Sequence, residues 1–154
     1  MYKYSDRNNI SLHDCRATKI LLIDNTLSFV FKDGFFVSEN SEYNHLGKLA
    51  YTDESEVRFD LPDKKAEADI TVYVYSKSDA GNISIREEIP FRKFAEDINS
   101  GMELEFLYSY TGGGSFIFKC WLWFDAEPYH KECELIIFAD EVRYFWNDLF
   151  ADDV

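Results

Sequence analysis

The chain has 154 residues, which is enough for one domain with a substantial hydrophobic core that needs no disulfides or metals. Lysine and arginine together number 16 against 29 aspartates and glutamates, so the net charge is -13, while 18% of the residues are aromatic. An acidic surface repels nucleic-acid phosphates and anionic membranes, so these partners are not expected and a cationic protein surface is favoured.

Apolar and polar residues alternate along most of the chain before residue 90, and this pattern predicts short β-strands. The expected strands are 17–23, 27–31, 35–37, 49–52, 57–61, 69–76 and 83–88. In the last of them Glu87 falls on the same side as Ile85 and Ile89. A buried carboxyl there would have a raised pKa, whereas a bulge or strand end would explain the position structurally.

Two segments show helical spacing instead. Pro90 is suited to open a helix that Gly101 ends, with Phe91, Phe94 and Ile98 on one face. The second segment begins at Asp140 as a cap, and its apolar stripe consists of Val142, Phe145, Trp146 and Leu149. We therefore expect helices at about 90–100 and about 140–150.

Three further strands are expected between these helices, at 102–110, 115–124 and 134–138, with the glycine-rich loop 111–114 closing a hairpin. The order of elements lacks the βαβ alternation of a parallel sheet. We expect one α+β domain, 1–154, with a mainly antiparallel curled sheet of about ten strands, as a half-barrel or two layers, and two helices.

The chain shows none of the sequence patterns that direct proteins out of the cytoplasm. The first ten residues have no basic region followed by an apolar run, and no segment approaches the roughly 18 apolar residues of a membrane helix. The three cysteines are an odd number without short-range pairing, which suits a reducing compartment. A cytoplasmic location is expected.

The one group of residues with metal-ligand chemistry is His13, Cys15, His130 and Cys133. Its spacing is not that of zinc knuckles, and a strand would turn His130 and Cys133 to opposite faces, so we expect no metal and no cofactor. The stretch His13-Asp14-Cys15 also resembles a nucleophile beside a base. A turn at Asp14, with His13 bonded to backbone, is the favoured interpretation.

A ligand site is the other candidate that the sequence offers. The residues we single out for it are Tyr108, Tyr110, Trp121, Trp123, Glu87 and Glu103. Aromatic rings supply contact area and a carboxylate supplies polarity, although strand propensity alone places tyrosines on sheet faces. Glu103 and Glu105 share a strand face as acid-base pairs must, but a solvated sheet face has the same pattern.

The segment Leu12–Val37, with His13-Asp14-Cys15 near its start and Asp33-Gly34 near its end, resembles the opening of several small β-rich bacterial protein families. Most of these are uncharacterised, and some are grouped with immunity proteins that neutralise toxins. The resemblance implies a bacterial, non-enzymatic inhibitor of a protein partner.

The leading functional hypothesis is a non-enzymatic, protein-binding module, immunity-type in character, whose acidic and aromatic surface binds a basic protein. An alternative is a small-ligand or enzymatic pocket at the open end of a curled sheet. A third alternative is a subunit that buries its aromatic face in a homo-oligomer.

Overall fold

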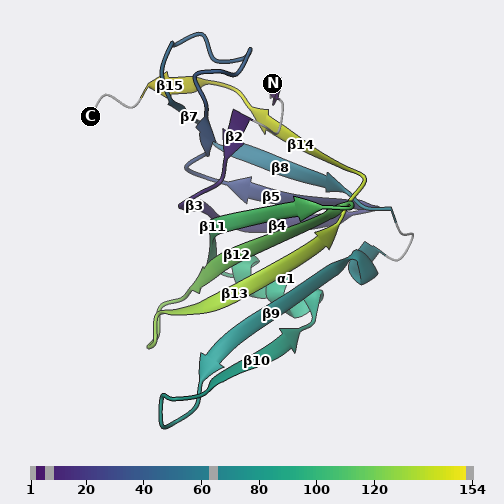
Figure 1. Ribbon diagram of the computed structural model, residues 1–154, viewed down its shortest axis with the longest axis vertical. Helices are drawn as coiled ribbons and strands as arrows, with labels where there is room; N and C mark the ends of the chain where they lie inside the picture. The colour runs from purple at the N-terminus through teal and green to yellow at the C-terminus, as the bar shows by residue number, and fades with distance from the viewer. Residues whose placement is uncertain (1–2, 6–8, 63–65, 152–154) are drawn as a thin grey trace.

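The computed structural model describes residues 3–5, 9–62 and 66–151, which form three antiparallel sheets and one α-helix (Figure 1). The first sheet has five strands in the order β1-β14-β8-β5-β4. Their bounds are β1 Lys3–Ser5, β14 Glu141–Trp146, β8 Ser55–Asp60, β5 Thr26–Phe31 and β4 Lys19–Ile23. These segments are rich in the β-branched and aromatic residues that favour a pleated, half-buried surface.

The second sheet has six strands in the order β10-β9-β13-β12-β11-β3. Their bounds are β10 Ser84–Ile89, β9 Ile70–Lys77, β13 His130–Phe138, β12 Ser115–Trp123, β11 Glu103–Gly112 and β3 Cys15–Ala17. The 3-10 helix η2 (Ala66–Asp69) precedes β9. The hairpin-connected strands β11, β12 and β13 form its centre. Buried residues alternate along most of β12 and β13, and along β11 only at Leu104 and Phe106.

A small third sheet lies at one end of the molecule, at the top of Figure 1, in the order β15-β7-β6-β2. Its strands are β15 Leu149–Ala151, β7 Ala50–Thr52, β6 Phe36–Val37 and β2 Ile10–Ser11. Two- and three-residue strands of this kind bring together segments that are far apart in the sequence.

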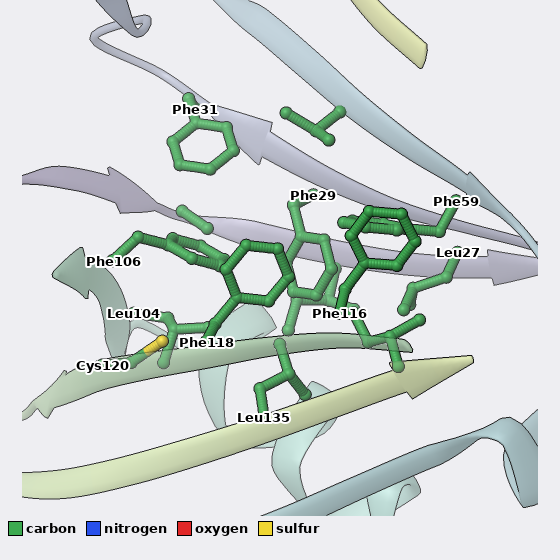
Figure 2. Packing of buried hydrophobic residues seen from close by; sticks show 14 of the residues in the cluster. Leu27, Phe29, Phe31, Phe59, Leu104, Phe106, Phe116, Phe118, Cys120 and Leu135 are labelled. Atoms are coloured by element: carbon green, nitrogen blue, oxygen red, sulfur yellow. The ribbon is translucent and has the colours of Figure 1, made fainter. Parts of the chain in front are cut away.

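The hydrophobic core lies between the five-stranded and six-stranded sheets and is built largely of phenylalanines (Figure 2). Phe29 of β5 meets Phe106 of β11 with ring centroids 5.6 Å apart, and Phe59 of β8 meets Phe118 of β12 at 5.9 Å. Both contacts are edge-to-face, the geometry that aromatic quadrupoles favour. Each buried ring contributes about 1.5–3 kcal/mol through removal of its surface from water.

The helix α1 (Phe91–Asn99) confirms the helix expected at 90–100 and lies on the core side of the six-stranded sheet, where it covers part of β9. It buries Phe91, Phe94 and Ile98. The Asn99 side chain accepts a hydrogen bond from the Ile20 main-chain N–H at 2.8 Å and donates one to the Ile20 carbonyl at 2.9 Å, which fixes the helix to β4. No helix in the described ranges is long and apolar enough to cross a membrane.

The helix predicted at 140–150 is wrong, because β14 and β15 occupy that segment. Val142, Tyr144 and Trp146 are buried while Arg143 and Phe145 are only partly buried, so the true period is two. Both faces of β14 carry large rings, and for this reason some of its apolar residues also fall at helical spacing. Ladders to β1 and β8 satisfy the backbone in place of a helix.

The expected α+β class, with about ten strands and two helices, is therefore also wrong: the described residues form a mainly β domain. Several of its strands have only two or three residues, too few for periodicity to reveal them. The expected strand 57–61 is confirmed as β8, which lies inside the five-stranded sheet between β14 and β5.

Candidate functional site

The six-stranded sheet has one face directed to the core and an opposite face that no described element covers. In Figure 1 this outer face is turned toward the viewer and α1 lies behind the sheet. Directly opposed residues in an antiparallel ladder share a face, so the register places one ring after another on it. The rings are Tyr73, Tyr75, Tyr108, Tyr110, Trp121, Trp123 and His130, which we call the aromatic face.

A cluster of two tryptophans and a histidine forms the middle of the aromatic face. His130 lies opposite Trp123 in the ladder, with its ring centroid 4.8 Å from Trp123 and 4.5 Å from Trp121. The two indoles meet edge-on at 5.6 Å. Mutual ring contact holds these partly buried side chains in place, although no other element of the described ranges packs over them.

Charged groups fix the edge of this cluster beside β3. The Arg16 guanidinium lies 4.4 Å from the Trp123 ring centroid and 3.4 Å from carboxylate oxygens of both Glu103 and Glu105. The Trp123 indole N–H donates to Glu105 at 2.9 Å. Both carboxylates thus serve to orient Arg16 and Trp123, and this arrangement is unlike an acid-base pair open to substrate.

Tyr108 and Tyr110 are the most exposed rings of the face, at 62% and 58%. A register shift between Phe106 and Tyr108 marks a bulge in β11, which brings both tyrosines onto the outer side. The strand pair ends in a tight turn at Gly113 and Gly114, whose φ angles of 59° and 81° favour glycine. The hairpin expected from the glycine-rich loop is confirmed.

On β9 the rings are combined with ionic groups. The Arg86 guanidinium lies 4.3 Å from the Tyr73 ring centroid, and the Tyr75 hydroxyl donates to Glu134 at 3.4 Å. Glu134 also pairs with Lys119, and this hydrogen bond raises the pKa of the Lys119 ammonium. The aromatic face is therefore interleaved with charged groups, of which Lys119 and Glu134 pair with each other.

A cleft of about 680 Å³ opens at one margin of the face. We call it the splayed cleft; its lining residues are Tyr75, Ser76, Lys77, Ser84, Trp121, Pro128, His130, Lys131 and Glu132. The ladder between β13 and β9 ends at the pair Cys133 and Val74, although both strands continue beyond it. From there β9 follows β10 and β13 follows β12, and Figure 1 shows the two hairpins spreading apart.

The turn expected at His13-Asp14-Cys15 is confirmed, and it leaves no nucleophile. Asp14 has a φ of 63°, and the His13 ring Nδ1 donates to the Leu107 carbonyl at 2.5 Å. Cys15 is buried, and burial followed by the nearby Asp14 charge raises the pKa of its thiol to about 12. A thiol with this pKa is protonated at neutral pH and does not act as a nucleophile.

The four metal-ligand candidates do not converge. Cys15, Phe106, Cys120 and Cys133 follow one another across four neighbouring strands on the core side, which separates Cys15 from Cys133 by roughly 14 Å. His130 lies on the opposite side of the sheet from Cys133, as its position three residues away predicts. The described residues contain no group of three potential metal ligands.

Of the six residues singled out for a ligand site, five lie on the outer face: Glu103, Tyr108, Tyr110, Trp121 and Trp123. Glu87 lies on the other side, opposite Val74, and is exposed because neither α1 nor the five-stranded sheet reaches that part of β10. It is therefore not a buried carboxylate. We did not predict a ligand-site role for His130, Lys77 or Lys131. Strand alternation, counted back from Cys133, places His130 on the face opposite to Cys133, which is the face that carries the tryptophans.

Comparison of the chain with models of protein families, with curated proteins and with solved structures finds no match.

Proposed function

We propose that this chain is a non-enzymatic protein-interaction module that binds a basic protein through its aromatic face. The observation that carries the proposal is a sheet face rich in Trp and Tyr that no described element covers. Tyr and Trp dominate the binding energy of protein interfaces because they are large, stiff and polar at one edge.

A contrast between the two large sheets of the same molecule supports a functional origin for these rings. On the outer face of the five-stranded sheet, Arg58 pairs with Glu56 at 3.1 Å and Arg143 pairs with Asp60 at 2.7 Å. The ring of β14 on this face, Phe145, is covered by the Arg58 guanidinium, 4.4 Å from its centroid. Such ion-paired strands are an adequate solvent face for an antiparallel sheet. The rings of the six-stranded sheet thus exceed what solvent exposure alone requires.

The charge of the chain supports a cationic partner. With a net charge of -13, the protein accelerates encounter with a basic surface. Locally, tryptophan and tyrosine faces bind lysine and arginine by cation–π contact, and Glu132 supplies a further carboxylate beside Trp121. The resemblance of Leu12–Val37 to immunity-protein families makes a toxic basic protein the first class of partner to test.

The size of the face agrees with this role. The strands β9, β13, β12 and β11 together span roughly 15 Å across, and a nine-residue strand spans roughly 30 Å. The product of these two lengths, which neglects the additional surface of protruding side chains, is more than half of the roughly 800 Å² that each partner buries in a stable interface.

The test is a capture experiment with two matched double variants of the tagged protein, at low and at moderate salt. Tyr108→Ser with Tyr110→Ser removes exposed rings from the face. Tyr51→Ser with Phe150→Ser removes a stacked pair, 5.5 Å apart, from the small third sheet. We expect a stoichiometric basic partner that binds wild type and the second variant and is lost from the first.

Two outcomes would contradict the proposal: no stoichiometric basic partner at either salt concentration, or equal loss from both variants. Native mass spectrometry of the free protein distinguishes the remaining alternative. A homo-oligomer that dissociates in the Tyr108→Ser, Tyr110→Ser variant would assign the face to self-association instead.

A further inference from the structure

We propose that the splayed cleft binds a small planar ligand that carries an anionic group, a function distinct from recognition of a protein on the aromatic face. The cleft volume of about 680 Å³ lies within the range of roughly 300–1,000 Å³ that is common for small-molecule sites. Its residues combine the three kinds of contact that such a ligand needs: rings, cations and free backbone groups.

The rings come from both walls of the cleft. Trp121 and His130 lie on the β12-β13 side, and Tyr75 lies on β9. His130 is in contact with both tryptophans, so Trp121 is held in a fixed place before any ligand arrives. A rigid ring loses little conformational entropy on binding, and a planar ligand gains stacking and burial against it.

The cations are Lys77, on the outer side of β9, and Lys131, on the core side of β13, and they line the cleft against a single carboxylate, Glu132. Lys131 also lines the groove beside α1. Other cations of the described chain, including Arg16, Lys93 and Lys119, form ion pairs. Lys77 and Lys131 form none with any described residue. A local excess of positive charge favours binding of an anion in the cleft, although the protein has a net charge of -13.

The backbone adds polar groups of fixed direction. Where β9 and β13 separate, residues 75–77 and 130–132 no longer pair with each other, so ladder groups on the facing edges are free to bind a ligand. The hydroxyls of Ser76 and Ser84 lie along the same cleft. The anionic group of the ligand and a polar substituent on its ring can therefore both form hydrogen bonds in the cleft.

Screening by salt determines whether the lysines of the cleft or the net negative charge of the protein controls the binding of an anion. At an ionic strength of about 0.15 M the Debye length is about 8 Å, so distant carboxylates are largely screened while lysines in contact with the ligand are not. The anion preference should thus be measured near this ionic strength.

The test uses three probes with one ring system: naphthalene-2-sulfonate, neutral 2-naphthalenemethanol and cationic 2-naphthylmethylammonium. Each is titrated into the full chain labelled with ¹⁵N, and amide shifts are followed. We expect the sulfonate to bind most tightly and the cation most weakly, with shifts centred on residues 75–77 and 130–132.

Charge variants separate the cleft from a general effect of net charge. Lys77→Gln and Lys131→Gln should each weaken the sulfonate about two- to fivefold and leave the neutral probe unchanged. Lys32→Gln, an exposed lysine in a distant turn, changes the net charge equally and should have no effect. Trp121→Ala should weaken all three probes.

The proposal is overturned if the sulfonate shifts no amide of the cleft at millimolar concentration, if the three probes bind equally, or if Lys32→Gln weakens the sulfonate as Lys131→Gln does. Lys131 lines both the cleft and the groove beside α1, so shifts confined to Lys131 and to residues of that groove such as Met102 and Phe124, without shifts at 75–77, would also overturn it. The lysine variants alter half-exposed or exposed side chains, so they keep the test decisive if Trp121→Ala does not fold.

Discussion

Alkaline pH should destabilise the fold through its buried thiols, and the effect of Cys133 can be worked out. Burial, assisted by the charge of Glu134, raises the pKa of Cys133 from 9.0 to about 12. Below pH 9.0 the thiol is protonated in both states; between 9.0 and about 12 only the unfolded chain ionises, so stability falls as pH rises. One pH unit above the unfolded pKa, this group alone costs about 1.4 kcal/mol.

The assay is urea unfolding under reducing conditions at about pH 8 and about pH 10. Cys133→Ala creates a small cavity, which lowers the free energy of unfolding by a similar amount at both pH values. The fall in the free energy of unfolding from about pH 8 to about pH 10 should therefore be smaller in the variant than in wild type by about 1 kcal/mol. Cys15, whose pKa is also raised to about 12, provides a second and independent variant. Equal pH dependence in wild type and Cys133→Ala would show that the thiol ionises as readily in the folded protein, and the reasoning would be refuted.

Two further substitutions test the packing, each beside a matched control. Gly34→Ala should destabilise the protein by more than about 2 kcal/mol, because a Cβ there would overlap the Thr52 carbonyl oxygen. Gly47→Ala, with a similar positive φ but no atom within 4 Å, should cost less in thermal unfolding. Phe106→Ala should cost about 3–5 kcal/mol in urea unfolding, because its ring contacts those of Phe29, Phe31 and Phe118, whereas Phe150→Ala on the surface should cost under about 1 kcal/mol. Equal losses within either pair would contradict the packing described above.

The sequence predicted those parts of the fold that depend on local pattern. The helix at Phe91–Asn99 has a proline before it, a glycine after it and a clean apolar stripe, and no competing period. The segment of β14 has rings on both faces, so helical spacing and strand alternation fit it equally well. The segment forms a strand because it pairs with β1 and β8, which are distant in the sequence and are therefore not part of the local pattern.

Most residues of the candidate site could be predicted from the sequence, but which face of the sheet stays uncovered could not. Alternation places Trp121 and Trp123 on one side of their strand, yet the sequence cannot say which side the rest of the chain covers. Two tryptophans on a central strand suggest burial on both faces, whereas the five-stranded sheet and α1 occupy the same side and leave the other open. The splayed cleft depends on where the β9-β13 ladder ends, which no local signal marks.

The two proposed sites share Tyr75, Trp121 and His130, and this determines which substitutions can separate them. Trp121 lies on the aromatic face and also lines the cleft, so its loss would affect both functions and identify neither. Tyr108 and Tyr110 lie on β11, with β12 and β13 between them and β9, outside the cleft lining. Lys77 and Lys131 line the cleft without belonging to the aromatic face. Because each function has side chains of its own, a failure of one proposal leaves the other intact.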